Sequence, residues 1–313
     1  MSCVIGGEIV HTQRNFRELL EARWAQGKYL CVGFDPVWSK LPPEITKGVD
    51  KDNQQQKACR VYDFCRSLVD RLHEQLACIK PNSAFWEAFG SDGMVALEKF
   101  CAYVRTYYPE LPIIGDVKRG DIGATNEAYR QSWLHAGFDA VTVHPYLGEE
   151  ALRPILDSEG LGVFVLCRTS NPGAGEFQDF AMHHPDPNSS VKIPLYQHVA
   201  RRVASWQERA KASLGLVTGA TSPAELAQVR ELVGPEMPLL IPGIGTQGGD
   251  LDASVAAAGG NFFIINCSSS VLYAYKKRGG HYLDAAEAEV VSVNEGITTA
   301  RASLAAEEGG ERR

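Results

Sequence analysis

The sequence contains no apolar run long enough to cross a membrane, and its first thirty residues lack the apolar core of a secretory signal peptide. It also lacks any run of lysine or arginine, and 38 acidic residues outnumber 31 basic ones, giving a net charge of −7. An acidic surface of this kind argues against nucleic-acid binding. We therefore expect a cytoplasmic protein with neither a nucleic-acid nor a membrane partner.

Metal-binding cysteine patterns are absent as well. The eight cysteines form no CxxC pair and no other metal-ligand spacing, and no metal cluster can be assembled around the histidine pair at 183–184. Cys31, Cys78, Cys167 and Cys267 lie within apolar runs, which indicates small buried side chains in a reducing compartment. The sequence predicts no metal site.

What the sequence does contain is eight apolar runs, at about residues 30, 78, 113, 141, 163, 215, 239 and 263. They alternate with helical patterns, such as the apolar face formed by Ala58, Val61, Cys65, Leu68, Leu72 and Leu76. Continuous apolar runs suit strands covered on both faces, as in parallel sheets. Eight strand–helix units predict an α/β fold, the (β/α)8 or TIM barrel. A doubly wound open sheet is the alternative, but no GxGxxG follows the first run.

The barrel accounts for nearly the whole chain, so we expect a single domain over 1–313. Its core spans about 28–276, preceded by a helix over 15–25 and followed by a helical tail over 281–313. Residues 171–193 show no periodicity and are rich in Pro, Gly, Asp, His and Asn. A structureless segment of that length in a compact domain predicts a lid or binding loop.

The third apolar run ends in a charged, glycine-rich turn. Asp116 closes the run, and Lys118 and Asp121 follow it. Two carboxylates held near a lysine keep it charged in a site shielded from water. A structural salt bridge is the alternative interpretation, although buried charge arrays rarely stabilise a fold on balance. Because active sites of these barrels lie at the carboxyl ends of the strands, we expect this turn to belong to one.

Polar residues also end the other runs. Lys80 is unusual, because a lysine at a barrel rim needs a partner of opposite charge. Asp35 and His144 each have a structural alternative to a role in the site. Asp35 precedes Pro36 and would then cap a turn, and His144 would be a polar residue with its hydrogen bonds satisfied. The glycine-rich segment 243–249 presents backbone N–H groups, which indicates a phosphate site. The run ends are Asp35, Lys80, Asp116 with Lys118, His144, Ser170, 243–249 and 268–270.

Six short motifs fall at these run ends in barrel order. They are VGFDP at 32–36, IKPN at 79–82, DVKRGDIGAT at 116–125, VHPYLG at 143–148, RTSNPGAG at 168–175 and PGIGTQGGD at 242–250. On these motifs the sequence resembles the orotidine 5′-monophosphate decarboxylase family, and most of all its longer bacterial-type branch. The resemblance covers nearly the whole chain.

The resemblance implies an enzyme that decarboxylates orotidine 5′-monophosphate to uridine 5′-monophosphate, the last step of de novo pyrimidine synthesis, without a cofactor. It implies an array of Lys80, Asp116, Lys118 and Asp121 in which Lys118 protonates C6 of the pyrimidine as carbon dioxide leaves. Asp116 would lie against the substrate carboxylate and hold Lys118. Loss of carbon dioxide leaves negative charge on a ring carbon with no electron sink, so fixed positive charge and a ready proton are what the reaction needs.

The resemblance also implies the substrate contacts. Asp35 and Lys80 would hold the ribose hydroxyls, Ser170 would touch the pyrimidine, and Gln247 would link base, phosphate and lid. Asn82 and Gly245 are placed among the substrate-binding residues too. Asp121 and Thr125 would reach into the neighbouring subunit's site, so the resemblance implies a homodimer.

One position departs from the family pattern. The family has an arginine that grips the phosphate in a pattern like Asn-x-Ser-Arg, whereas this chain reads NCSS at 266–269, with Ser269 at the arginine position. Loss of one charge-assisted hydrogen bond, worth roughly 1.5–3 kcal/mol, weakens phosphate binding about ten- to a hundredfold. Serine hydroxyls and backbone amides would compensate in part, or an arginine would come from elsewhere, and we keep Ser269 among the substrate-binding residues.

Two alternative functions remain open on the sequence. One is a catalytically impaired or silent pyrimidine-nucleotide-binding barrel, suggested by Ser269. The other is a magnesium-dependent sugar-phosphate decarboxylase or aldolase of the same superfamily, which shares the Asp-x-Lys-x-x-Asp spacing. Those relatives carry an acid near the end of the second strand, where this sequence has Lys80.

Overall fold

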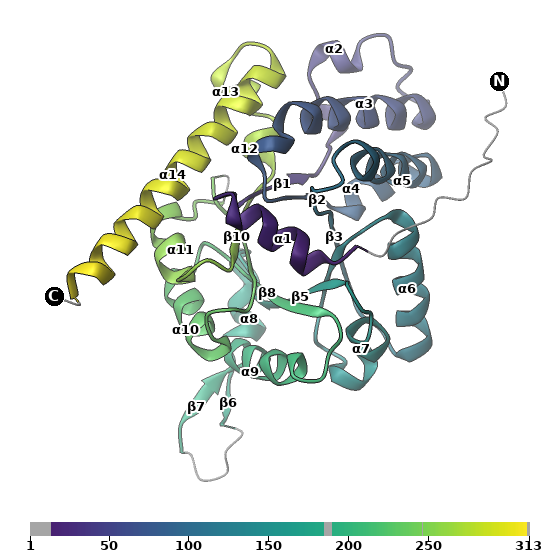
Figure 1. Ribbon diagram of the computed structural model, residues 1–313. Coiled ribbons are helices and arrows are strands. Elements are labelled where there is room, and N and C mark those ends of the chain that lie inside the picture. The colour runs from purple at the N-terminus through teal and green to yellow at the C-terminus, as the bar shows by residue number, and fades with distance from the viewer. Residues whose placement is uncertain (1–13, 185–189, 246, 312–313) are drawn as a thin grey trace.

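The computed structural model describes residues 14–184, 190–245 and 247–311. Its centre is an eight-stranded sheet in the order β2-β1-β10-β9-β8-β5-β4-β3 (Figure 1). The two outermost strands of this order, β2 and β3, are joined by the parallel bridges Ile79–Ile113 and Asn82–Asp116, so the sheet closes into a barrel. Each predicted apolar run is a barrel strand: β1 (Leu30–Phe34), β2 (Cys78–Pro81), β3 (Ile114–Arg119), β4 (Ala140–Val143), β5 (Gly162–Arg168), β8 (Ser213–Thr218), β9 (Leu239–Pro242) and β10 (Phe263–Cys267). The (β/α)8 barrel is confirmed.

The barrel strands are buried almost from end to end, which is why their sequences are continuously apolar. Every residue of β1, β2, β4 and β10 is buried. Helices cover the outer face of the sheet, as Figure 1 shows, and side chains of the strands fill the interior. Most exceptions occur near the carboxyl ends, where Lys118 and Arg119 close β3 with exposed or half-buried side chains.

The outer helices form where the apolar periodicity predicts them. In α3, Asn53 caps the first turn by accepting the Gln56 N–H at 2.9 Å, and the predicted apolar face from Ala58 to Leu72 is buried. The helices are α1 (Phe16–Ala25), α2 (Pro43–Thr46), α3 (Gln54–Leu72), α4 (Ser83–Glu87), α5 (Gly90–Tyr107), α6 (Gly123–Ala136), α7 (Gly148–Leu156), α8 (Gly175–Gln178), α9 (Leu195–Gln207), α10 (Pro223–Val233), α11 (Leu251–Ala258), α12 (Ser269–Leu272), α13 (Tyr275–Arg278) and α14 (Tyr282–Glu311), with 3₁₀ turns η1 (Trp38–Lys40), η2 (His73–Gln75) and η3 (Pro172–Ala174).

Helix α1 covers the amino-terminal end of the barrel, and Figure 1 shows it lying across the barrel mouth. Phe16 packs edge-to-face on Phe164 of β5 at 5.7 Å between ring centroids. The indole N–H of Trp24 donates to the Phe263 carbonyl of β10 at 2.9 Å. Because α1 covers this end, the barrel interior is open to a ligand at the carboxyl end of the strands. No helix in the described ranges has the length and apolarity that a membrane span requires.

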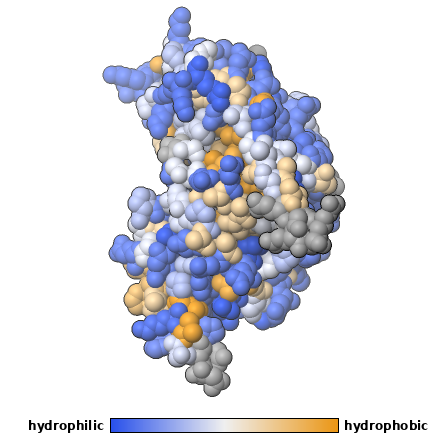
Figure 2. All heavy atoms as spheres, turned by 90° about the vertical axis from the view of Figure 1, so that its left-hand side faces the viewer, coloured by the Kyte–Doolittle hydropathy of each residue, from blue (hydrophilic) through white to orange (hydrophobic). Residues whose placement is uncertain are grey.

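The segment predicted to be structureless, 171–193, contains short elements. It holds η3, α8 and a hairpin of β6 (Ala181–His183) and β7 (Lys192–Pro194), while 185–189 lie outside the described residues. Elements of three or four residues are too short to leave a periodic signal, so the sequence pattern missed them. Phe177 and Phe180, each 68% exposed, lie on this segment. Figure 2 shows the face turned toward its viewer as mainly hydrophilic, with hydrophobic residues in small separate areas.

Candidate active site

A cavity of about 630 Å³ opens at the carboxyl end of the barrel strands. Residues from the ends of β1, β2, β3, β5, β9 and β10 converge on it. It is the place where a barrel of this kind positions chemistry. Seven of the predicted site residues line it: Asp35, Lys80, Asp116, Lys118, Ser170, Gln247 and Ser269.

Asp116 holds two lysines at the bottom of this cavity. The Lys80 Nζ lies 2.7 Å from its Oδ2, and the Lys118 Nζ lies 2.5 Å from its Oδ1. The side chains of Lys80 and Asp116 are 5% and 7% exposed, whereas that of Lys118 is 47% exposed. Lys118 is therefore the member of the cluster that a ligand in the cavity meets first.

Electrostatics keep these buried groups ionised. Burial alone would raise the pKa of Asp116, but the charges and hydrogen bonds of Lys80 and Lys118 outweigh it and hold the pKa well below its ordinary value. Burial alone would lower the pKa of Lys80, but Asp116 and then Asp35 raise it above its ordinary value. The cluster is thus a fixed arrangement of charges at neutral pH.

Thr142, which is not among the predicted site residues, ties the cluster together. Its side chain on β4 is buried, and its Oγ1 accepts the Lys118 backbone N–H at 3.0 Å and donates to Asp116 Oδ1 at 2.9 Å. Lys118 has φ 45°, and no other non-glycine residue in the described part of the chain has a positive φ. Such a backbone costs of order 1–3 kcal/mol and persists where the surroundings impose it, which is typical of functional sites.

Two residues that line the cavity each carry a buried oxygen without a hydrogen-bond partner among the described residues. These oxygens are Oδ1 of Asp35 and Oδ1 of Asn266. Most buried polar atoms in folded proteins have a hydrogen-bond partner, so this pair at the cavity favours a ligand that donates hydrogen bonds. Burial raises the pKa of Asp35, opposed by Lys80. Ser268 lies close to the backbone of β1 because residue 33 is glycine. A Cβ at residue 33 would lie 1.9 Å from Ser268 Oγ.

The side chains of Ser170 and Gln247 both lie close to Gly243, the residue that follows β9. A Cβ at Gly243 would lie 3.1 Å from Ser170 Cβ and 3.0 Å from Gln247 Oε1, and Gly243 adopts φ 112°, so only glycine fits here without strain. Gly245 does not line the cavity and lies beside Ser270, with φ 83°. Thr246, part of the same motif, lies outside the described residues.

Besides Gly245, three other predicted site residues do not line the cavity. Asn82 caps α4 by accepting the Ala84 N–H at 3.2 Å, and its Nδ2 lies 3.5 Å from Asp116 Oδ2. Asp121 is half-buried and accepts the Ile122 N–H at 2.7 Å, while Lys118 is paired with Asp116. Thr125 lies in the first turn of α6. Within one chain the charged cluster therefore has one carboxylate where the sequence spacing suggested two.

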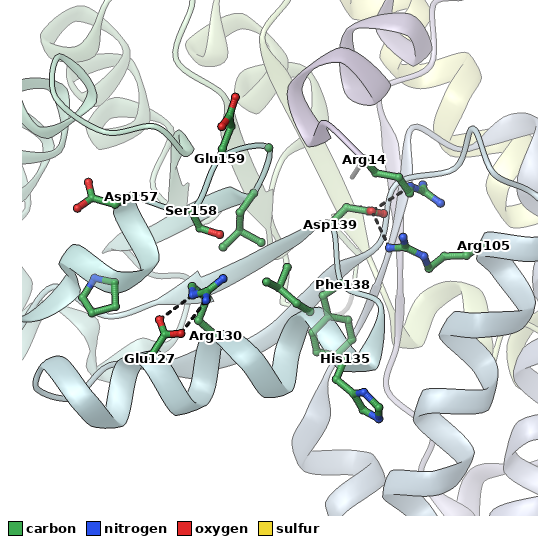
Figure 3. A pocket seen from close by; sticks show the side chains of 14 residues that line it. Arg14, Arg105, Glu127, Arg130, His135, Phe138, Asp139, Asp157, Ser158 and Glu159 are labelled. Carbon is green, nitrogen blue, oxygen red and sulfur yellow. Dashed lines mark hydrogen bonds and ion pairs between the residues drawn. The ribbon is translucent and has the colours of Figure 1, made fainter. Parts of the chain in front are cut away.

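A second cavity, of about 780 Å³, lies at the opposite end of the barrel, beside the starts of β4 and β5. Figure 3 shows Glu127 joined to Arg130, and Asp139 joined to both Arg14 and Arg105. Asp139 joins Arg14 and Arg105 at 3.0 and 3.3 Å, and Arg130 joins Glu127 at 2.7 Å. Asp139 Oδ2 also accepts the Ile113 N–H at 2.8 Å. This cluster holds the end of the barrel together, and none of the predicted site residues lies in it.

None of the cysteines in the described part of the chain lines the active-site cavity. Cys31, Cys78, Cys167 and Cys267 are buried thiols, as their apolar runs predict. Burial raises the pKa of Cys167 and Cys267 to about 12, so both are protonated at neutral pH. Across the described ranges, no group of three His, Cys, Asp or Glu side chains is arranged to hold a metal ion.

Comparisons with known proteins identify relatives of this chain. Residues 28–278 match the model of the orotidine 5′-phosphate decarboxylase / HUMPS family. An orotidine 5′-phosphate decarboxylase of Janthinobacterium sp. (strain Marseille) is 44% identical over 265 residues, which are 83% of this chain and 90% of that protein. The one of Roseiflexus castenholzii is 40% identical over 292 residues, 91% of this chain and 98% of that protein. The structure of Leishmania donovani OMP decarboxylase superposes with a TM-score of 0.71 at 32% identity, covering 91% of this chain and 99% of that one.

Proposed function

The chain belongs to the orotidine 5′-phosphate decarboxylase / HUMPS family, and we propose that it converts orotidine 5′-monophosphate to uridine 5′-monophosphate and carbon dioxide, the last step of de novo pyrimidine synthesis. The observation that carries this proposal is the buried Asp116 held between Lys80 and Lys118 at the open end of the barrel. A strained backbone at Lys118 and the pairing of both ammonium groups are costly features for a fold to keep without a function.

The proposed mechanism uses Lys118 as the proton donor. Breaking the bond between C6 and the carboxylate leaves an electron pair on C6 with no ring position to delocalise it. The Lys118 ammonium, already charged and half exposed in the cavity, stabilises that charge as it develops and then transfers its proton to C6. The neutral amine is reprotonated from water. Asp116 lies against the departing carboxylate and holds Lys118 in place, and Lys80 balances the charge of Asp116 from below.

The ribose is assigned to the side of the cavity that carries unsatisfied acceptors. Asp35 and Asn266 each present a buried oxygen without a partner in the described chain, and sugar hydroxyls are donors of the kind that satisfies them. Lys80 lies beside Asp35 and contributes its remaining donors. Ser170 would contact the pyrimidine and Gln247 would connect the base with the phosphate, which is supported by their meeting over Gly243.

We further propose that the enzyme is a homodimer in which Asp121 and Thr125 enter the partner's cavity. Neither residue lines the cavity of its own chain. Apolar side chains are exposed next to them and on the following strand-end loop: Ile122 is 62%, Tyr146 92% and Leu147 43% exposed. An exposed apolar area beside a site that lacks one carboxylate supports burial against a second copy of the chain.

The metal-free, cofactor-free reaction and the cytoplasmic location are parts of this proposal. Buried thiols such as Cys31 and Cys78, adjacent in register on β1 and β2, fit a reducing compartment. The magnesium-dependent sugar-phosphate alternative expects an acid near the end of β2, where Lys80 contacts Asp116. The silent-binder alternative leaves the retained charge cluster unexplained.

A substrate panel separates these functions. Purified protein is given orotidine 5′-monophosphate, or a keto-sugar acid phosphate with Mg²⁺, and released carbon dioxide is quantified alongside UMP binding. We expect carbon dioxide from the nucleotide alone. Release from the sugar phosphate would establish the magnesium-dependent alternative, and UMP binding without any release would establish the silent binder.

A further inference from the structure

The active-site cavity is lined by a third lysine that the proposed mechanism does not use. The acidic and basic side chains around it are Asp35, Asp116, Lys80, Lys118 and Lys40. Lys80 and Lys118 are both ion-paired with Asp116. Lys40 is exposed, and no carboxylate in the described part of the chain lies within ion-pair distance of its ammonium.

The charge of the proposed substrate makes this lysine significant. Orotidine 5′-monophosphate carries a carboxylate and a phosphate with a second pKa near 6, so it enters with about three negative charges at neutral pH. Without Lys40, the two remaining lysines and two aspartates of the lining cancel. A phosphate dianion held against a neutral lining would lose its hydration without gaining a counter-charge. Lys40 supplies the net positive charge.

The fold fixes the position of Lys40 beside the segment that follows β10. The Tyr273 hydroxyl accepts the Val37 N–H at 2.7 Å and donates to the Asp35 carbonyl at 3.0 Å. The Tyr275 hydroxyl donates to the Lys40 carbonyl at 2.9 Å. Two tyrosines that follow α12 thus fasten η1 to the strand end that carries Ser268 and Ser269. The Lys40 Nζ lies 5.7 Å from the centroid of the Tyr273 ring, and that ring lines the cavity.

Neighbouring cations are engaged or lie elsewhere. Arg168, at the end of β5, makes two contacts with the Asp179 carboxylate, at 2.8 and 3.0 Å, and does not line the cavity. Lys276 lies at the same 5.7 Å from the Tyr273 ring but outside the cavity. Among the described residues that line the cavity, Lys40 is therefore the lysine without an ion-pair partner.

We propose that Lys40 binds the 5′-phosphate of the nucleotide, on the side of the cavity formed by Ser268 and Ser269. This inference rests on the proposed function. The serine side chains offer hydroxyl donors without charge, and the lysine adds three donors and one positive charge on a flexible stem. Lys40 thereby supplies the positive charge for phosphate binding at the end of β10, where Ser268 and Ser269 carry no charge.

The test compares nucleotide with nucleoside binding in three variants. Lys40→Gln removes the charge, Lys40→Arg keeps it, and Lys276→Gln is the matched control beside the same ring. Isothermal titration calorimetry measures the affinity of each for UMP and for uridine, and thermal unfolding confirms that each variant is folded. We expect Lys40→Gln to weaken UMP roughly ten- to a hundredfold and to raise the KM for orotidine 5′-monophosphate similarly. Uridine affinity should not change, and Lys40→Arg and Lys276→Gln should bind UMP like the wild type.

Two results would overturn the inference while leaving the proposed function intact. One is an unchanged affinity of Lys40→Gln for UMP, and the other is an equal loss of its affinity for UMP and for uridine. Both results count only if the wild-type protein decarboxylates orotidine 5′-monophosphate. If the wild type neither binds UMP nor decarboxylates, the proposed function fails, and this inference fails with it.

Discussion

Replacing Thr142 by valine tests how the catalytic lysine is held. Valine keeps the shape of threonine but removes the hydroxyl that accepts the Lys118 N–H at 3.0 Å and donates to Asp116 at 2.9 Å. The first hydrogen bond is neutral and worth about 1 kcal/mol, and the second involves a carboxylate and is worth roughly 1.5–3 kcal/mol. We expect the free energy of unfolding to fall by about 2–4 kcal/mol and Tm by roughly 4–8 °C.

The catalytic effect of this substitution should exceed its structural cost. The Thr142 hydroxyl is the side-chain partner of the strained Lys118 backbone, which has φ 45°. Releasing it lets the ammonium shift from the position where C6 is protonated, and displacements of about 1 Å cost up to roughly a hundredfold in rate. Steady-state kinetics should show kcat reduced about ten- to a hundredfold in Thr142→Val, with Thr142→Ser close to the wild type. A folded Thr142→Val protein with wild-type kcat would refute the reasoning.

Three further predictions follow from the same cluster and its surroundings. Although burial acts in the opposite direction, Lys80 and Lys118 hold the pKa of Asp116 below its ordinary value. The ionised Asp116 therefore stabilises the folded protein fully above about pH 4, and this contribution is lost as the pH falls below that value. In urea unfolding from pH 6 to pH 3, the free energy of unfolding should therefore depend less on pH in Asp116→Asn than in the wild type. The variant should also be less stable at pH 7 by about 3–5 kcal/mol. An identical pH slope in both proteins would contradict the pairing of Asp116 with the two lysines. Mixing inactive Lys118→Ala with inactive Asp121→Ala should restore about a quarter of wild-type activity. Half of the randomly mixed dimers contain one subunit of each variant, and each such dimer regains one of its two active sites. No recovery of activity after verified subunit exchange would exclude a site shared between subunits. Ser269→Arg should lower the KM for orotidine 5′-monophosphate roughly tenfold, and an unchanged or higher KM would show that an added cation at this position does not help to bind the phosphate.

The barrel could be predicted from the sequence because its signal is local. Each of the eight apolar runs became a barrel strand, and Asp35, Lys80 and Asp116 line the cavity because strand ends meet at one rim in this fold. The lysine pairing could be anticipated from the two-residue spacing between Asp116 and Lys118. These features depend on periodicity and on position along a strand, which a single sequence records.

The remaining features depend on contacts between distant segments. Thr142 is one hydroxyl in an apolar strand, and only the register of β3 and β4 brings it between Asp116 and Lys118. Lys40 follows β1, yet tyrosines more than two hundred residues later fix its position. No short-range pattern carries such information. The hairpin of β6 and β7 was missed for a different reason, because three-residue strands leave too little periodicity to detect.

The most direct test of the central claim is the loss of orotate absorbance when purified protein is mixed with orotidine 5′-monophosphate in the presence of a metal chelator, for the wild type and Lys118→Ala. We predict that wild-type turnover is unaffected by the chelator and that the product is UMP, while Lys118→Ala is folded and inactive. Turnover that the chelator abolishes and Mg²⁺ restores, or wild-type turnover in Lys118→Ala, would contradict a decarboxylase in which Lys118 alone supplies the charge and the proton.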